Sequence, residues 1–470
     1  MNNNRLTEGN IFKSIIKLAL PIMGTSFVQM AYNMTDMIWI GRVGSKAVAA
    51  VGTAGFFTWL GMAFILISKI GAEVGVAQSI GKKDIQAAKK FIRHTIQINI
   101  LLALLYGTCL FIFRNQLISL FNLRDVEVIN MAVNYLKIIA LGIVFFFINP
   151  IFTAILNGYG NSKTPFIINT IGLIINMVLD PLLILGLGPL PALGVKGAAL
   201  ATITAQFIVT MIFVYNANNM MLFSEIHLFK LPKVHYVKRI VKIGLPVAMQ
   251  SGLFTIFAMM IARIIANWGE IPIAVQKVGS QIEAISWMTA SGFSTAISAF
   301  VGQNYGANKW ERIYKGYFTA IGIVSIVGVI ATCLLIFGAR PIFSIFIPEE
   351  EAIRQGVIYL RILGLSQLFM CIEITTAGAF NGLGKTLPPS IVSIVLTGLR
   401  VPASMVLSSS NLLGLNGVWW SISMSSVFKG IILMTWFIIL LVKSPYFKKD
   451  KLELFLKKMG GKIKYIKWGD

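Results

Sequence analysis

The sequence predicts an all-α polytopic membrane protein with twelve transmembrane helices arranged in two six-helix lobes. Three observations predict this fold. The composition is 56% hydrophobic and only 13% charged, long apolar runs follow one another along the chain, and the second half repeats motifs of the first. A soluble domain carries about 25% charged residues, so this chain has too few for an aqueous fold. Its mean hydropathy of +0.78 agrees.

The apolar runs are long enough to cross a bilayer, which takes about 20 residues. The first run exceeds the core of a secretory signal and no small-residue cleavage site follows it, so a retained helix is expected. Several runs contain proline, which helices in lipid tolerate. The predicted spans, in order, are 14–38, 48–76, 92–113, 131–156, 164–187, 196–216, 239–266, 273–301, 314–338, 356–380, 387–409 and 414–442.

The basic residues predict the orientation of these spans. If the N-terminus is inside, 27 of the 41 Lys and Arg fall on that side, 11 lie in or beside the opposite loops and 3 lie within spans. Lys and Arg accumulate in cytoplasmic loops, so both termini are expected in the cytoplasm. The net charge of +23 is therefore mainly a topology signal, and the basic tail is expected to lie against anionic lipid.

The two halves match at a nearly constant offset. Leu20-Pro21 returns as Leu245-Pro246, and Gln78-x-x-Gly81 returns as Gln303-x-x-Gly306. Asn157-Gly158-x-Gly160 returns as Asn381-Gly382-x-Gly384, and Gly194-x-x-Gly197 returns as Gly414-x-x-Gly417. Six spans per half give parallel repeats, related by a pseudo-two-fold axis along the membrane normal. The predicted parts are an N-terminal lobe (1–216), a cytoplasmic linker (217–238), a C-terminal lobe (239–442) and a basic tail (443–470).

Other function classes find little support in the sequence. The three cysteines form no CxxC pair and the three histidines have no metal-binding spacing, so no cofactor is expected. Neither a GxSxG nor a P-loop motif occurs, which argues against an enzyme. The basic residues are dispersed among loops, which argues against nucleic-acid binding.

Several motifs resemble the multidrug and toxic compound extrusion (MATE) transporters. They are Pro21 in the first span, Thr35-Asp36-x-x-x-x-Gly41-Arg42-x-Gly44, the Asn-Gly-x-Gly element with its following Lys-Thr, and Gly194-Val-x-Gly-Ala-Ala199. The resemblance implies lobes that enclose a cavity and export of organic compounds, lipophilic and cationic, in exchange for H⁺ or Na⁺. It further implies a monomer in the cytoplasmic membrane of a prokaryote. A lipid-linked oligosaccharide flippase of the same superfamily stays as the alternative.

Five acidic residues fall within predicted spans, where ionisable groups are costly and are functional candidates. Tyr32 precedes Asp36 by one helical turn, and Asn176 precedes Asp180 by one turn, so each pair shares a helix face. The resemblance to the DinF-like branch implies that Asp36, Asn176 and Asp180, with Thr202 and Asn149, form the cation-coupling site, to which Tyr32 is added by its spacing. The buried carboxylates could exchange a proton, or the oxygens of Asp36, Asp180 and Asn176 could instead coordinate Na⁺. The structural alternative is that Asp36 marks the extracellular mouth and Asp180 only caps a helix.

The remaining polar candidates are assigned to a substrate cavity, and Pro21 is assigned to a hinge. The cavity candidates are Glu283, Glu373, Gln29, Asn157 and Arg400. For Glu283 the alternative is a hydrogen-bonded structural role, and for Arg400 it is a charged partner inside the lobe. Glu73, which follows Lys69 by one helical turn, is expected to form a structural ion pair. Residues 250–263 contain no acid, which leaves open which lobe couples to the ion.

Overall fold

The computed structural model describes residues 6–186, 191–220, 222–223, 226–228, 230–409 and 411–444. Every regular element in these ranges is a helix. Ten of the described helices are long and apolar enough to cross a membrane, and the stretch Leu387–Leu407 makes an eleventh span. The bent pair Glu350–Gly364 and Gln367–Gly382 makes a twelfth. The predicted all-α membrane fold is therefore confirmed. The predicted basic tail lies outside the described residues, apart from Lys443 and Ser444.

The chain forms fifteen helices in the parts that are described. The first half contains α1 (Ile11–Val43), α2 (Ser45–Gly81), α3 (Ile85–Ser119), α4 (Val126–Tyr159), α5 (Lys163–Ile184) and α6 (Val195–Asn218). The second half contains α7 (Val234–Ala266), α8 (Glu270–Gly306), α9 (Trp310–Phe337), α10 (Ala339–Ser344), α11 (Glu350–Gly364), α12 (Gln367–Gly382), α13 (Leu387–Gly398), α14 (Arg400–Leu407) and α15 (Leu415–Val442).

Short polar side chains fix where several of these helices begin. Asn10 accepts a hydrogen bond from the Lys13 amide at the start of α1, and Asp84 accepts one from the Ala87 amide at the start of α3. Such caps satisfy amides that have no partner within the helix. At the other end of α4, Gly160 adopts a left-handed φ of 95°, which glycine reaches without strain. The helices therefore extend beyond the apolar runs into capped, polar ends.

One span of the second half is broken and another is interrupted at a single residue, which the sequence did not predict. The run at 356–380 is divided between α11 and α12, which meet at a bend of 49°. The run at 387–409 is divided into α13 and α14 around Leu399. Hydroxyl groups of neighbouring helices accompany the first break: Thr332 donates to the Gly364 carbonyl at 2.8 Å and Ser423 donates to the Ile362 carbonyl at 2.9 Å. In lipid, a freed carbonyl needs such a partner.

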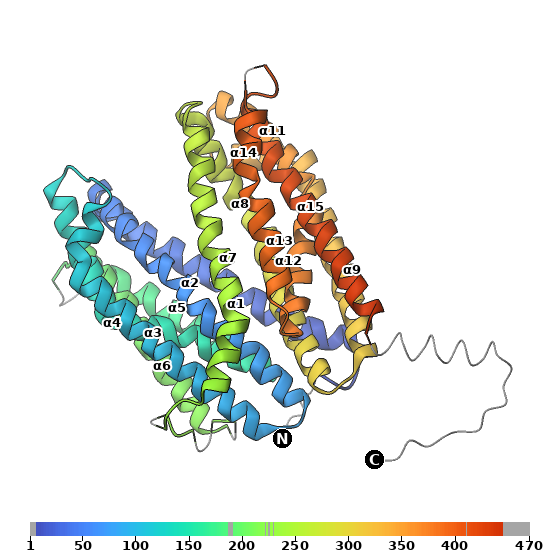
Figure 1. Cartoon of the computed structure of the whole chain (residues 1–470). Helices are drawn as coiled ribbons and strands as arrows, with labels where there is room; N and C mark the ends of the chain where they lie inside the picture. Colours follow the sequence, from blue (N-terminus) through green and yellow to red (C-terminus); the bar gives the residue numbers. More distant parts are fainter. Residues whose placement is uncertain are drawn as a thin grey trace, which may run out of the picture.

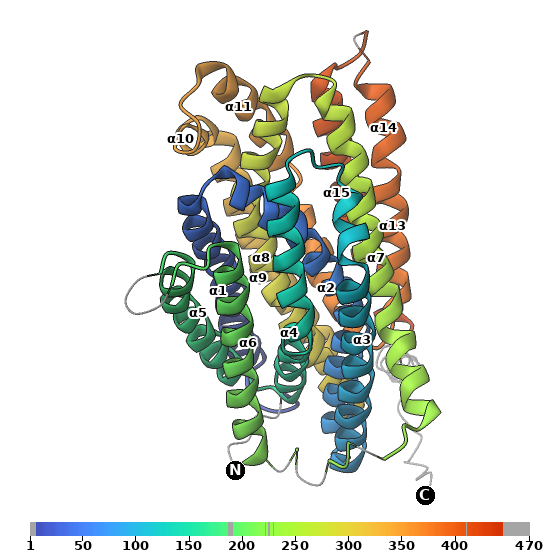
Figure 2. The ribbon, with the colours of Figure 1, turned by 90° about the vertical axis from the view of Figure 1, so that its left-hand side faces the viewer.

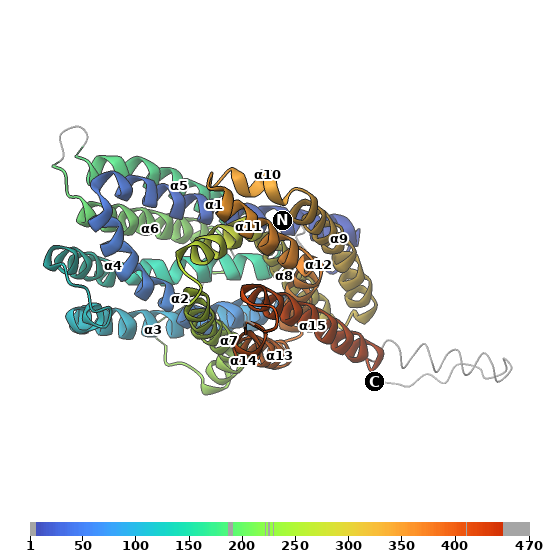
Figure 3. The ribbon, with the colours of Figure 1, turned by 90° about the horizontal axis from the view of Figure 1, so that it is seen from above.

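Helices α1–α6 and α7–α15 form two bundles that diverge toward the upper end of Figure 1. From the side, most helices run along one common direction (Figure 2). From above, α1 and α7 lie at the boundary between the bundles (Figure 3). The first half of α1, with Ile15, Leu18 and Ile22, packs in the core of the second bundle, whereas Ile40 near its end packs in the first. Helix α1 is therefore shared by both lobes, and Pro21 lies at the crossing.

The two bundles pack closely at the lower end, where α2 and α8 end. A Cβ atom on Gly81 would overlap the backbone of Gln303, and one on Gly306 would overlap the backbone of Gln78. Small residues allow helices in membranes to approach in this way. Gln78 donates to the Gly382 carbonyl at 2.9 Å, and Gln303 donates to the Gly158 carbonyl at 3.0 Å. These reciprocal contacts join the lobes at the end that the basic residues predict to be cytoplasmic.

Candidate functional site

A cluster of polar side chains lies inside the N-terminal lobe, in its upper third. Asp36 stands seven residues before the end of α1, Asp180 four before the end of α5, and Thr202 seven after the start of α6. At 1.5 Å per residue, each is within about 10 Å of the upper end. Alternation of helix direction therefore brings residues far apart in the sequence to one depth.

The two carboxylates form the centre of this cluster. Asp180 and Asn176 have no exposed surface, and the Asn176 amide donates to Asp180 at 3.1 Å. Asp36 and Asp180 are close enough to interact electrostatically. The Tyr32 hydroxyl lies beside Thr202 and Gln206. The structure thus brings together Asp36, Asp180, Asn176, Tyr32 and Thr202, as the sequence grouped them.

Four buried oxygens of the cluster have no hydrogen-bond partner among the described residues. They are Asp36 Oδ1, Asp180 Oδ2, Asn176 Oδ1 and the Tyr32 hydroxyl. Buried polar atoms in native proteins are nearly always satisfied, so a group of unsatisfied ones needs an explanation. A proton on one carboxylate would give it a donor. A hard cation, which takes oxygen ligands, would satisfy several of these atoms at once. The donor set fits either H⁺ or Na⁺.

Tyr135 and Gln206 extend the cluster, and neither was among the residues predicted from the sequence. Tyr135, on α4, interacts electrostatically with Asp36, Tyr32 and Asp180. Gln206 follows Thr202 by one turn of α6, so the two side chains share a helix face. This spacing could have identified Gln206 from the sequence. Its Oε1 atom accepts a hydrogen bond from Asn149 at 2.7 Å. Asn149 therefore joins the cluster indirectly, through Gln206.

A small cavity adjoins the cluster between α1, α5 and α6. Its volume of about 20 Å³ is enough for one water molecule. Gln29, Tyr32, Asn169 and Gln206 contribute polar atoms to its lining. Gln29, assigned to the substrate cavity, therefore lies beside the acidic cluster. Asn157 lies apart from it, two turns of α4 below Asn149.

The acids of the C-terminal lobe lie among basic partners. Glu373 pairs with Lys429, both almost fully buried, and Arg400 donates to Ser425 and Ser426. Lys429 was missed because a single lysine in an apolar run has no spacing signal. Arg400 and Glu373 are thus held by contacts inside the lobe, which for Arg400 is the alternative given with its assignment. Glu283 accepts a hydrogen bond from Gln367 at 3.2 Å.

Glu73 lies where the two lobes meet. It is 3% exposed and lies beside Ser298 of α8 as well as Lys69 of its own helix. Its backbone carbonyl also contacts Gly158. A structural role between the lobes agrees with these contacts.

Comparisons with known proteins agree with one another. The profile of the MatE family matches residues 21–182 and 246–406, once in each half. A probable multidrug resistance protein NorM of Thermotoga maritima is 30% identical over 91% of this chain and 92% of its own length. The multidrug export protein MepA of Staphylococcus aureus is 24% identical over 88% and 90%. A crystal structure of a MATE protein in a bent conformation covers 94% of this chain and 98% of its own, with 22% identity and a TM-score of 0.88.

Proposed function

Because the chain belongs to the MatE family of membrane transporters, we propose that it exports organic compounds in exchange for H⁺ or Na⁺ by alternating access. The substrates are lipophilic and cationic, and the protein works as a monomer in the cytoplasmic membrane of a prokaryote with both termini inside. The names of its relatives support multidrug efflux as the class of activity.

The observation that carries the proposal is the group of four unsatisfied oxygens in the N-terminal lobe. They come from two helices, α1 and α5, and include two carboxylates. A site of this composition attracts a cation, and it loses negative charge when the cation binds. Because its members lie on helices that reach the upper end, ion binding is coupled to how α1 packs against α5.

The exchange follows from this charge change. An ion enters from outside and neutralises part of the Asp36–Asp180 pair. With less negative charge, the lobe holds a cationic substrate less tightly, so the substrate leaves to the outside. Helix α1 then bends at Pro21, where the missing proline N–H already weakens the helix. The lower end opens and the ion leaves to the cytoplasm. The membrane potential adds about 2.3 kcal/mol per charge for each 100 mV.

The test is dye efflux in proteoliposomes with an imposed pH gradient and, separately, a Na⁺ gradient. The gradient that accelerates efflux identifies the ion. The variant Asp36→Asn should lose gradient-driven efflux, at least tenfold, while its thermal unfolding stays near that of the wild type. Transport at the wild-type rate by Asp36→Asn would refute the coupling site.

Asp125→Asn is the matched control, because it makes the same chemical change at a residue that is only partly buried and lies outside the cluster. Asp125 caps α4 and pairs with Lys46 at 2.9 Å, and asparagine is an equally good cap. Its efflux should equal that of the wild type. If the wild type moves no dye but relieves accumulation of lipid-linked oligosaccharides, the flippase alternative replaces the proposal.

A further inference from the structure

Four ionisable side chains meet inside the C-terminal lobe. Glu283 comes from α8, Glu373 from α12, Arg400 from α14 and Lys429 from α15. Two are acidic and two are basic, so their formal charges sum to zero. The cluster of the N-terminal lobe, in contrast, contains two carboxylates and no basic residue among the groups described above.

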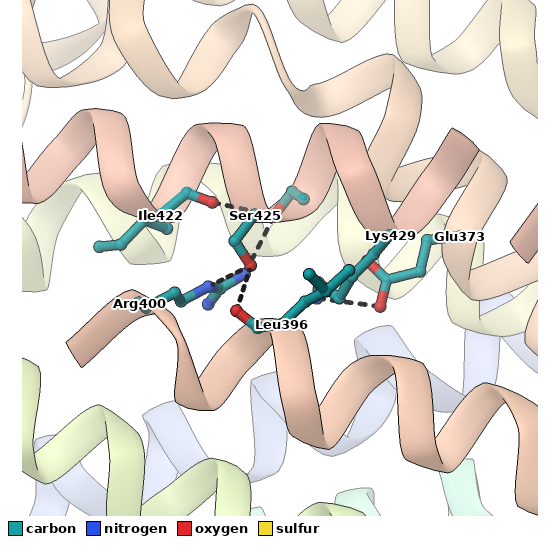
Figure 4. Close-up of polar contacts among 7 residues, drawn as sticks. Glu373, Leu396, Arg400, Ile422, Ser425 and Lys429 are labelled. Atoms are coloured by element: carbon teal, nitrogen blue, oxygen red, sulfur yellow. Dashed lines mark hydrogen bonds and ion pairs between the residues drawn. The ribbon is translucent and has the colours of Figure 1, made fainter. Parts of the chain in front are cut away.

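The basic residues are held by direct contacts (Figure 4). Lys429 Nζ lies 2.9 Å from Glu373 Oε1, and the two side chains are 7% and 9% exposed. Arg400 Nε donates to Ser425 Oγ at 2.8 Å, and a terminal nitrogen donates to Ser426 Oγ at 3.1 Å. Ser425 in turn donates to the Leu396 carbonyl at 3.0 Å. Both cations are therefore positioned by the helices around them.

Glu283 completes the group. Its Oε2 atom accepts from Gln367, while Tyr359 lies next to it. Arg400 interacts electrostatically with Glu373, Glu283 and Tyr359. Glu373 is thus paired directly with Lys429. Glu283 interacts with Arg400 only electrostatically, and its Oε1 atom has no hydrogen-bond partner among the described residues.

The internal repeat relates this cluster to the one in the N-terminal lobe. At the offset of the Asn-Gly-x-Gly element, Tyr135 corresponds to Tyr359 and Asn149 to Glu373. At the offset of the Leu-Pro element, the place of Asp36 is taken by Ile261. Near the place of Asp180, which precedes a proline, stands Arg400, shortly before Pro402. The place of Asp36 thus carries no acid in the second half, and a base stands near the place of Asp180.

We propose that the C-terminal lobe holds a cation site permanently filled by the side chains of Lys429 and Arg400, so that exchangeable ions bind only in the N-terminal lobe. A tethered ammonium excludes a dissolved cation, because a second positive charge beside it in a buried site would be repelled. Removing it would leave an uncompensated buried carboxylate, and that carboxylate would recruit an ion from solution. The proposal rests on the proposed function for the exchange role of the N-terminal site.

Thermal unfolding of the purified protein in Na⁺, compared with choline at equal ionic strength and at two pH values, tests this. The background is Asp36→Asn with Asp180→Asn, which removes the N-terminal carboxylates. In this background Na⁺ and acid should bring no specific stabilisation. Adding Lys429→Met should create one, a rise in Tm of about 2 °C or more with Na⁺ or at the lower pH.

The control adds both Lys429→Met and Glu373→Gln to the same background, and removes the pair without leaving a charge. It should show no ion dependence, and equal behaviour of the two variants would overturn the proposal. If the protein with Lys429→Met fails to fold, the double variant Lys429→Met with Glu373→Gln, made in otherwise wild-type protein, tests the proposal by itself. Its gradient-driven efflux should stay within twofold of wild type, and loss of ion coupling would overturn the inference. The Tm measurement does not depend on transport, so it tests this inference by itself. If the proposed function is wrong, the wild-type protein will show no ion-driven efflux, which is a separate result.

Discussion

At the scale of single residues, Asn176 tests how the acidic cluster holds its ion. Its amide donates to Asp180 at 3.1 Å, while its own Oδ1 atom has no partner among the described residues. Leucine would remove both the donor and the free oxygen at nearly constant volume. A hydrogen bond to a charged group contributes about 1.5–3 kcal/mol. Asn176→Leu should therefore raise the ion concentration for half-maximal efflux by at least about tenfold.

Asn134→Leu is the control for this change. Asn134 lies on α4, one residue before Tyr135, and donates only to the Asn130 carbonyl of its own helix. Initial rates of dye efflux at graded ion concentrations provide the measurement. An unchanged ion dependence in Asn176→Leu would exclude this residue from the site.

The residues that could be predicted from the sequence are those with a local signal. Tyr32 with Asp36, and Asn176 with Asp180, are spaced by one helical turn, and the structure places both pairs in one cluster. Lys429 gives no such signal, because its partner Glu373 stands far earlier in the chain, on another helix. A pair of this kind becomes visible only when the helices are packed. The same holds for Tyr135, which stands on α4 and comes near Asp36 and Asp180 only when the helices of the lobe are packed.

At the scale of elements, the hydroxyl groups at the break between α11 and α12 can be tested. Thr332 and Ser423 donate to carbonyls that the break frees. In membrane proteins such side-chain hydrogen bonds contribute about 0.6 kcal/mol each. The double variant Thr332→Val with Ser423→Ala should therefore lower the free energy of unfolding by about 1 kcal/mol, measured by reversible denaturation in mixed micelles. A stability equal to wild type would mean that other groups satisfy these carbonyls.

Thr319→Val is the control for this double variant. Thr319 donates to the Lys315 carbonyl one turn earlier in its own helix, so its loss frees no carbonyl at a break.

Hydropathy could predict that these segments cross the membrane. It could not predict the break, because Gly364-Leu365-Ser366 is as apolar as many continuous spans. The equivalent helix of the first half, α4, contains Pro150 and yet continues.

At the scale of the whole molecule, the two lobes exchange their first helices. Ile15 of α1 is buried in the core of the second lobe, and Ile240, which holds the corresponding position in α7, is buried in the core of the first. Each lobe thus holds the lower half of a helix whose upper half belongs to the other. The sequence predicted the repeat and its offset, but such an exchange leaves no trace in composition or spacing. It makes the lower end a shared structure, which must separate if the lobes are to open there.

The reciprocal glutamines are the contacts that such opening would break. Gln78 and Gln303 each donate to a backbone carbonyl of the other lobe, and each accepts from a further segment, Arg239 and the Leu6 amide respectively. A net contribution of about 1 kcal/mol for each of the two inter-lobe bonds predicts that Gln78→Leu with Gln303→Leu shifts the equilibrium toward an open lower end by about 30-fold. Each single variant should give about the square root of this shift.

Spin labels at exposed Gln86 and Glu311, in a background without the native cysteines, would report the distance across the lower end. Gln97→Leu is the control, because Gln97 lies at the same end but donates to linker carbonyls at Leu228 and Lys230. The double variant should gain a population at longer distance that neither wild type nor control has. Identical distance distributions would mean that the close helix crossing at Gly81 and Gly306, rather than the glutamines, keeps this end closed.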